Sequence, residues 1–239
     1  MKVTTVRAWA LMKTATAAKI VAYRTGLHRQ LFYKYNYMFS PADLATLVDC
    51  LTQTHDLPGP ILEIGCAAGN TTVFLNKHVD ELDDKRRYYC LDTFAGFMPE
   101  DIAVEVGRGK DADHYKHVFK SYRKKWFDQT MVNNNVRRVE SIQADVNTYD
   151  FGRFDQISFC LIDVDLMRPV IRSLEEVLPR MAPGGLIAVD DCAPSNRWDG
   201  ALAGYTEFVE QQGLEPDIRN NMLGMIQVPR DVASDLPTC

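Results

Sequence analysis

Two short acidic segments contain side chains that could bind a metal ion. One segment holds Asp163 and Asp165, the other holds Asp190 and Asp191, and each directly follows an apolar run. If the two runs are neighbouring parallel strands, the four carboxylates meet at one edge of the sheet, where their repulsion raises their pKa values unless a cation neutralises them. Hard oxygen ligands in this number suit Mg²⁺. The alternative is a set of separate, solvated turn aspartates.

A glycine-bearing segment, residues 60–75, has the sequence PILEIGCAAGNTTVFL and could bring backbone amides close to a ligand. Gly65 and Gly69 permit positive φ and a close approach of the backbone. Between them lie three small residues, Cys66, Ala67 and Ala68. The spacing differs from the G-x-G-x-x-G pattern of dinucleotide-binding folds, and an ordinary strand-turn-helix is the alternative.

Polar residues at both ends of this turn also have predicted roles. Glu63 interrupts an apolar run, and a buried carboxylate needs a polar partner, so we expect it to face one. Asn70 is predicted to cap the helix that follows. Two further acids, Asp92 and Asp145, end predicted strands, although Asp92 could instead build a simple turn with Thr93 and Gly96.

The acids and the glycine-bearing segment can form one site only if the strands that precede them end at the same edge of a sheet. Apolar runs bounded by turn formers predict strands at 61–64, 88–91, 139–146, 154–162 and 186–189, and a closing hairpin is predicted at residue 218 and residues 222–228. Helices are predicted to begin at Ser40-Pro41, to cover 114–132 and 201–211, and to run from Pro169 to Pro183-Gly184-Gly185. Residues 98–113 are predicted to form a long loop. The order predicts an α/β fold with a Rossmann-like, mostly parallel, seven-stranded sheet and helices on both faces.

The chain is predicted to divide into a helical arm and cover at 1–58 and one compact domain at 59–239. Residues 1–42 carry seven lysines and arginines and no acid. An apolar stripe at helical spacing contains Trp9, Met12, Ile20, Tyr23 and Leu27. A transit peptide or a membrane-surface helix could look like this, but we favour a helix packed on its own domain or on a second subunit, which predicts a homodimer through this arm. Aromatic residues at 32–39 could cover an active site or pack in the core.

Composition excludes several classes of protein. The 239 residues, 46% hydrophobic and 25% charged, suit a globular α/β protein. The net charge of -5 argues against nucleic acid as a partner. Six cysteines occur singly, without a C-x-x-C pair, which makes a zinc knuckle improbable and fits a reducing cytoplasm. No apolar run approaches the ~20 residues of a membrane span.

Several segments resemble known methyltransferases. The pattern E-x-G-x-x-x-G at 63–69 resembles motif I of the class I methyltransferases that use S-adenosylmethionine (SAM). The segments DTFAGF at 92–97, CLIDVDL at 160–166 and PGGLIAVDDC at 183–192 resemble the macrocin O-methyltransferase family over residues 61–211. That family consists of enzymes that need SAM and Mg²⁺ and methylate sugar hydroxyls of natural products. Its members often have Tyr where this chain has Met167, which leaves the acceptor pocket open.

The resemblance implies a role for each matching residue. In it, the glycine loop wraps the methionine part of SAM, Asp92 holds the ribose, Phe94 lies against the adenine and Asp145 contacts the adenine amino group. The implied SAM-binding residues are Glu63, Gly65, Cys66, Ala67, Gly69, Asp92, Thr93, Phe94, Asp145 and Asp163. The implied metal ligands are Asp163, Asp190 and Asp191. Asp165 is implied to act as the general base toward a small-molecule or saccharide hydroxyl.

Two other functions remain open at this point. Catechol-type O-methyltransferases share the fold and the metal site, but their usual third ligand is Asn where this chain has Asp191. Their flat acceptor needs an apolar pocket, which Phe97 and Trp198 could supply. A nucleotide-binding protein or dehydrogenase without methyl transfer is the second alternative, and both the missing glycine of the dinucleotide pattern and the acidic segments count against it.

Overall fold

A computed structural model describes residues 17–18, 20–21, 24–25, 37–195 and 198–230. The chain divides into two compact units, Met1–Tyr37 and Met38–Cys239. Every strand and all the helices named below belong to the second unit. They include the helix at residues 41–53, which lies within the bounds of the predicted arm. Most of the predicted amino-terminal helix, and the aromatic residues before Tyr37, lie outside the described residues.

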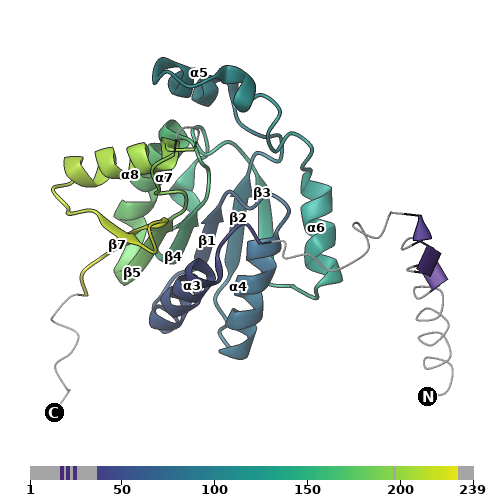
Figure 1. Cartoon of the computed structure of the whole chain (residues 1–239). Helices are drawn as coiled ribbons and strands as arrows, with labels where there is room; N and C mark the ends of the chain where they lie inside the picture. Colours follow the sequence, from purple (N-terminus) through teal and green to yellow (C-terminus); the bar gives the residue numbers. More distant parts are fainter. Residues whose placement is uncertain (1–16, 19, 22–23, 26–36, 196–197, 231–239) are drawn as a thin grey trace, which may run out of the picture. The chain divides into compact units, whose positions relative to one another are not determined.

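Seven strands form one sheet in the order β3-β2-β1-β4-β5-β7-β6 (Figure 1). Their bounds are β1 Ile61–Ile64, β2 Tyr88–Asp92, β3 Val139–Gln143, β4 Ile157–Ile162, β5 Met181–Val189, β6 Asp217–Arg219 and β7 Leu223–Gln227. Strands β1 to β5 are parallel to one another, while β7 runs antiparallel to both β5 and β6. The central strands β1 and β4 are buried at every residue, which explains why they are apolar except at Glu63 and Ser158. The predicted mostly parallel α/β sheet is confirmed.

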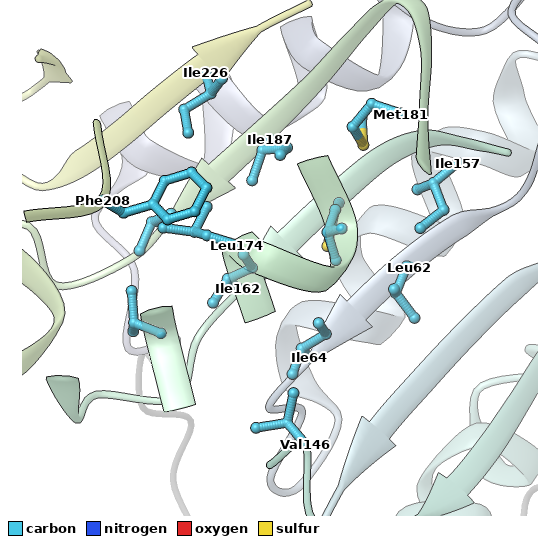
Figure 2. Packing of buried hydrophobic residues seen from close by; sticks show 14 of the residues in the cluster. Leu62, Ile64, Val146, Ile157, Ile162, Leu174, Met181, Ile187, Phe208 and Ile226 are labelled. Carbon is cyan, nitrogen blue, oxygen red and sulfur yellow. The ribbon is translucent and has the colours of Figure 1, made fainter. Parts of the chain in front are cut away.

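Helices cover both faces of this sheet (Figure 1). Their bounds are α3 Pro41–Gln53, α4 Asn70–Glu81, α5 Pro99–Gly107, α6 Lys124–Asn133, α7 Met167–Val177 and α8 Gly200–Gln211. Leu174 of α7 and Phe208 of α8 pack with Ile162 and Ile187 of the sheet in the main core (Figure 2). Among the described residues, no helix has the length and apolar character needed to cross a membrane.

Helix α5 replaces the long loop predicted at 98–113. Pro99 occupies the first turn together with Glu100 and Asp101, an arrangement that favours helix initiation. Two of its three buried residues are the acids Asp101 and Glu105, so the helix has no apolar stripe that a search for hydrophobic periodicity would find.

The helix predicted over 114–132 is also corrected. The structure has a short 3₁₀ helix at Ala112–His114, followed by a series of turns that extends to the start of α6. Phe119 has a φ of 57°, a left-handed conformation that an α-helix does not contain. The segment therefore bends, and its aromatic residues face one another rather than lining one helical side.

Two predicted helix ends also differ from the structure. Gly69, with a φ of 84°, occupies the N-cap of α4, and Asn70 is the first helical residue. Pro183-Gly184-Gly185 lies within β5, where the pairing with β4 shifts between Ile157 and Phe159. Gly184 donates a backbone hydrogen bond to Val228 and Val228 donates one to Gly185, so the glycines form an irregular part of the strand and do not terminate a helix.

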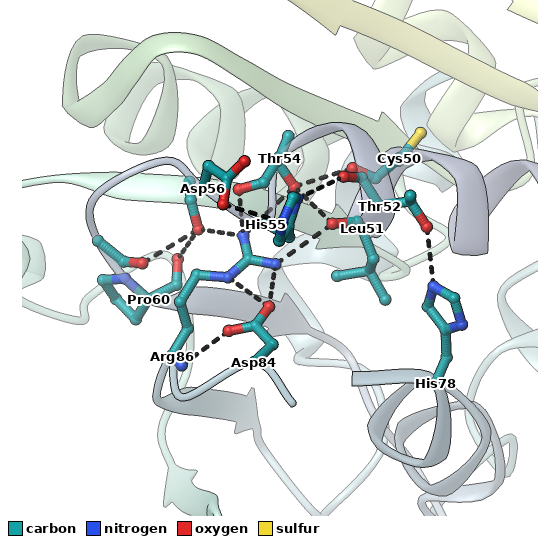
Figure 3. Close-up of polar contacts among 12 residues, drawn as sticks. Cys50, Leu51, Thr52, Thr54, His55, Asp56, Pro60, His78, Asp84 and Arg86 are labelled. Atoms are coloured by element: carbon teal, nitrogen blue, oxygen red, sulfur yellow. Dashed lines mark hydrogen bonds and ion pairs between the residues drawn. The ribbon is translucent and has the colours of Figure 1, made fainter. Parts of the chain in front are cut away.

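A buried ion pair joins α3 to the amino-terminal ends of the strands (Figure 3). The Arg86 guanidinium contacts Asp84 at 2.6 Å and donates to Thr54 and Ser158. The exposed fractions of the Arg86 and Asp84 side chains are only 8% and 2%. Because a buried pair needs every donor satisfied to offset its desolvation, these extra bonds stabilise the end of the sheet opposite the predicted site.

Candidate active site

A cavity lies at the carboxyl ends of the parallel strands, where ligands bind in open α/β sheets. Nine of the predicted site residues line it: Gly65, Ala67, Asp92, Thr93, Asp145, Asp163, Asp165, Asp190 and Asp191. Four others do not: Glu63, Cys66, Gly69 and Phe94. The structure thus brings the glycine loop and the acidic segments to the same cavity, while the role of each residue stays a proposal.

The glycine loop needs its glycines for reasons of space. Gly65 has a φ of 85°, and a Cβ there would lie 1.8 Å from the carbonyl oxygen of Asp163. At Gly69, with a φ of 84°, a Cβ would lie 2.6 Å from the Met131 side chain and 2.9 Å from that of Phe127. The loop therefore packs directly against the segment after β4 on one side and against α6 on the other.

Asp92 holds the glycine loop in place. Its Oδ2 accepts backbone hydrogen bonds from Cys66 at 2.9 Å and Ala67 at 2.8 Å, and its Oδ1 accepts one from Phe94 at 2.6 Å. A carboxylate has about four lone-pair sites, so one site remains for a ligand hydroxyl at the cavity wall. Asp92 could therefore position the loop and bind a ribose at the same time.

Asp145 belongs to a polar chain that reaches α5. Asn147 donates to Asp145 Oδ1 from its backbone at 2.9 Å and from its side chain at 2.8 Å. The same amide nitrogen lies 3.2 Å from Asp101, which also pairs with Arg168 at 2.9 Å. Burial raises the pKa of Asp101 to about 6, while Arg168 acts in the opposite direction. Asp101, Asn147 and Arg168 were not predicted as site residues.

Three predicted site residues do not line the cavity but are buried near the glycine loop: Glu63, Cys66 and Phe94. Glu63 is buried and accepts hydrogen bonds from Tyr88 at 2.7 Å and Thr72 at 3.0 Å, so the expected polar partners exist. Burial raises its pKa to about 7. Cys66 is buried and contributes its backbone amide. The Phe94 ring, 2% exposed, packs 5.5 Å from that of Phe127, away from the cavity where an adenine would stack.

The acidic segments come together because β4 and β5 are paired. Ile162 is paired with Val189, so Asp163 and Asp190 follow opposed residues. Asp165 has a φ of 61° and Asp191 one of 58°, conformations that carry strain for residues other than glycine. The neighbouring Asp191 carboxyl is one of the causes that raise the pKa of Asp165, after burial.

The four aspartates share a buried environment in which their carboxylates repel one another. Burial and then the neighbouring carboxylates raise the pKa of Asp163, Asp165 and Asp190, the last to about 8. Asp190 Oδ1 is buried with no hydrogen-bond partner, which leaves a hard oxygen donor available. In the described part of the chain no three acidic, histidine or cysteine side chains are arranged to hold a metal ion together. Carboxylate oxygens are the type of ligand that Mg²⁺ prefers, and metal ligation stays a proposal.

Several residues that line the cavity were not predicted as site residues. Asp43, 3% exposed, lines it from the first turn of α3 and accepts a hydrogen bond from Asn220 at 3.2 Å. Phe119 stacks on Tyr122 with centroids 5.7 Å apart and meets Phe97 edge-on at 5.5 Å. The only available signal for these rings was their number between residues 94 and 122, which a helical assignment obscured.

Comparison with protein families decides the class of this domain. A family described as a methyltransferase domain matches residues 62–192, which is more than half of the chain. The chain belongs to this methyltransferase family. The match begins in β1 and ends just after Asp191, so it contains the glycine loop, Asp92, Asp145 and the acidic segments.

Among curated proteins, the 4'-O-methyltransferase of 8-demethyl-8-(2,3-dimethoxy-alpha-L-rhamnosyl)-tetracenomycin-C from Streptomyces olivaceus is 24% identical over 144 residues. The match covers 57% of this chain and 54% of that protein, so the chain spans about half the length of this curated relative.

Two solved structures resemble the methyltransferase fold of this chain. The O-methyltransferase NovP superposes with a TM-score of 0.70 at 17% identity, over 82% of this chain and 84% of that one. CalS11, described as a TDP-rhamnose 3'-O-methyltransferase of calicheamicin biosynthesis, has a TM-score of 0.56 at 19% identity over 93% of both chains. At these identities the similarity shows the fold alone.

Proposed function

We propose that this methyltransferase uses SAM to methylate a hydroxyl oxygen of a sugar. The observation that carries the proposal is one cavity bordered by the glycine loop and Asp92 after β1 and β2, and by the acidic segments after β4 and β5. A methyl donor on the first side would face an acceptor oxygen on the second. The curated relative and CalS11 are both described as enzymes that methylate a rhamnose hydroxyl, which supports a sugar acceptor.

The reaction forms one bond and breaks one. The acceptor oxygen attacks the methyl carbon of SAM, the carbon–sulfur bond breaks, and its electron pair stays on sulfur, giving the neutral thioether. The hydroxyl proton passes to the Asp165 carboxylate. Holding oxygen and methyl group in line accounts for much of the rate, and a positioned base adds about 10²–10⁴-fold.

Asp163, Asp190 and Asp191 would hold Mg²⁺ in this scheme. Such a cation would supply Lewis-acid chemistry that lowers the pKa of an acceptor hydroxyl, and it would neutralise the surrounding carboxylates. The free Oδ1 of Asp190 supports this assignment. Asp92 and Asp145 would bind the ribose and the adenine of SAM, and we place the enzyme in the cytoplasm.

A phenolic acceptor is the second candidate. The rings of Phe97, Phe119 and Tyr122 border the cavity and could hold a flat catechol. A phenol, with a pKa near ~10, loses its proton more readily than a sugar hydroxyl and would depend less on Asp165.

Mass spectrometry of reactions with sugars, glycosides and catechols, with and without Mg²⁺, tests the proposal. We expect a mass increase of one methyl group on a sugar hydroxyl that requires Mg²⁺. Calorimetric titration with SAM and with NAD separates the methyltransferase from a nucleotide-binding protein, since only the first binds SAM. Methylation of catechols alone would replace the sugar by a phenolic acceptor.

A further inference from the structure

We propose that Asp101 is a positioning residue that joins the SAM-binding side of the cavity to the segment that carries Asp165. This inference rests on the proposed function, in which Asp145 binds the adenine and Asp165 receives the proton. Asp101 borders the cavity from the first turn of α5, yet it is only 4% exposed. It therefore acts through two neighbouring side chains, Asn147 and Arg168, rather than on the substrate itself.

One amide nitrogen connects Asp101 to Asp145. The Asn147 side chain donates to Asp145 Oδ1 at 2.8 Å and lies 3.2 Å from both carboxylate oxygens of Asp101. Because an amide nitrogen carries two N–H groups, each acid can accept one of them. The amide oxygen of Asn147 is buried without a hydrogen-bond partner, and turning the amide over would place that oxygen against two carboxylates. The two acids therefore fix the orientation of this side chain.

Asn147 leaves one oxygen of Asp145 for a ligand. Its backbone and its side chain both donate to Oδ1, and none of the described residues donates to Oδ2. Since Asp145 lines the cavity, Oδ2 is the oxygen that remains for the amino group of an adenine. A fixed Asn147 thus holds Asp145 in the orientation that this contact needs.

Arg168 carries the connection to the segment after β4. It is the second residue of α7, three positions after Asp165, and its Nη1 donates to Asp101 Oδ1 at 2.9 Å. One turn further along α5, Glu105 accepts a hydrogen bond from the Met167 amide at 2.9 Å. Helix α5 therefore holds the start of α7 at two points, both within three residues of Asp165.

This connection links two strand ends that are not neighbours in the sheet. The strand order β3-β2-β1-β4 places β2 and β1 between the strand before Asp145 and the strand before Asp165. The side chains on α5 provide a route between these two acids that does not pass through the glycine loop. Adenine binding at Asp145 should therefore stabilise the segment that accepts the proton.

The ionised form of Asp101 makes these contacts, because it accepts hydrogen bonds from both neighbours. Burial raises its pKa to about 6, the Arg168 guanidinium opposes this rise, and the Asp145 carboxylate adds to it. The next acid on the same helix face, Glu105, pairs with Arg108. Asp101 is therefore charged at pH 8 and neutral at pH 5, and the connection should weaken between these pH values.

Hydrogen exchange measured by mass spectrometry tests the connection, with adenosine as the probe. Adenosine has the adenine and ribose of SAM but lacks the methionine part and the methyl group. At pH 8, saturating adenosine should slow exchange of the Met167 amide at least about threefold in the natural protein. Asp101→Asn should abolish this slowing. Asn147→Ala should do the same at a half-buried position, and it decides the matter if Asp101→Asn does not fold.

Two results of this experiment would overturn the inference. One is the same slowing in both folded variants, and the other is no slowing in a natural protein that binds adenosine. A natural protein that binds neither adenosine nor SAM would instead refute the proposed function.

Calorimetric titration with SAM at several pH values separates positioning from a merely structural role. At pH 8, Asp101→Asn should bind SAM about 3- to 10-fold more weakly than the natural protein. At pH 5 the ratio of the two Kd values should approach one, since the natural side chain is then also uncharged. Other acids titrate in both proteins and leave the ratio unaffected. A ratio that is the same at both pH values would overturn the inference.

Turnover of methyl rhamnoside with SAM and Mg²⁺ gives a third readout. At saturating SAM and pH 8, kcat of Asp101→Asn should be about 3- to 10-fold lower, because the segment with Asp165 is held less firmly. Glu100→Gln is the control, since Glu100 is exposed on the same helix, and it should change neither kcat nor SAM affinity. An unchanged kcat in Asp101→Asn would limit Asp101 to SAM binding and overturn the connection.

Discussion

Single carboxylates in this protein serve more than one partner, and Asp92 is the clearest case. Its two oxygens accept three backbone hydrogen bonds from residues 66, 67 and 94, while its side chain also borders the cavity. A substitution there should therefore affect ligand binding and loop position together.

Asp92→Ala should lower the affinity for SAM at least tenfold, since each charge-assisted hydrogen bond is worth about 1.5–3 kcal/mol. Calorimetric titration measures this loss, and a thermal melt confirms that the variant is folded. Asp155→Ala, an exposed acid at the opposite end of the sheet, serves as the control. Unchanged SAM affinity in folded Asp92→Ala would contradict the ribose assignment.

The two kinds of aspartate in the acidic segments should respond differently to loss of charge. Asp190→Asn should weaken Mg²⁺ binding, so that excess metal restores part of the activity. Asp165→Asn should keep Mg²⁺ and SAM affinity and lower kcat by about 10²–10⁴-fold, with no recovery at any metal concentration. Metal titrations of activity, together with direct Mg²⁺ binding, distinguish the two.

The outcome also distinguishes the acceptors. A small effect at Asp165 with a large one at Asp190 favours a phenolic acceptor. Full activity of every variant in the presence of a chelator would eliminate the metal-assisted mechanism.

Glu63 should make the stability of the protein depend on pH. Burial raises its pKa from 4.5 to about 7, so between these pH values the folded chain keeps a proton that the unfolded chain has released. Stability therefore falls as the pH rises through this window, by up to about 3 kcal/mol from this group.

Glu63→Gln mimics the protonated side chain and should escape this loss. Thermal melts at pH 5 and pH 8 should show a larger Tm advantage of the variant over the natural protein at pH 8. Glu81→Gln, at an exposed position of α4, should show no such change. An advantage that is equal at both pH values would argue against the buried carboxylate as the cause.

At the scale of elements, strands and helices differ in how well the sequence predicts them. The strands β1 and β4 were predictable because burial on both faces makes their residues apolar, with Glu63 and Ser158 as the exceptions. Helix α5 was missed because Asp101 and Glu105 face inward and are stabilised by partners far along the chain, Arg168 and Met167. Such partners exist only once the chain has folded, so local periodicity cannot indicate them.

The residues of the candidate site were also only partly predictable from the sequence. Strand-end acids such as Asp92 and Asp163 were predictable, because parallel strands bring their ends to one edge. The position of Phe94 in the core and the lining role of Asp43 depend on loops and on a helix far from the motif. Neither could be predicted from spacing.

Helix α5 should control the geometry of the segment that carries Asp165. Glu105 is fully buried, accepts a hydrogen bond from the Met167 amide at 2.9 Å, and pairs with Arg108. A Cβ at Gly200 would lie 2.6 Å from Glu105 Oε1 and 2.8 Å from the Asp165 carbonyl, so these three groups pack without spare room.

Glu105→Gln should therefore lower kcat while leaving SAM affinity nearly unchanged, and it should lower stability by about 1–3 kcal/mol. Steady-state kinetics and calorimetry measure the two effects. Glu100→Gln lies at an exposed position of the same helix and should change neither. A loss of SAM affinity equal to the loss of kcat would show a general disturbance of the cavity instead.

At the scale of the whole molecule, the unit Met38–Cys239 contains all the lining residues of the cavity. The basic segment before it remains a predicted contact with the domain or with a second subunit. Its lysines and arginines, without any acid up to residue 42, would also suit a charged membrane surface.

Deletion of residues 1–30 should change the mass in solution from dimer to monomer or lower the melting temperature, because apolar area would become exposed. Light scattering and thermal melts measure both, with the full chain as reference. If the truncated protein keeps the oligomeric state, melting temperature and activity of the full chain, the segment is dispensable for assembly. That result would favour a membrane or targeting role.

The contact between Gly65 and the Asp163 carbonyl has a mechanical consequence. The loop proposed to hold the methyl donor and the segment proposed to hold the acceptor are the ends of adjacent strands, β1 and β4, touching backbone to backbone. Neither can slide without the other. The pairing of β1 with β4 would thus fix the distance between methyl donor and acceptor. Residues elsewhere in the cavity could then change to accept new substrates without altering that distance.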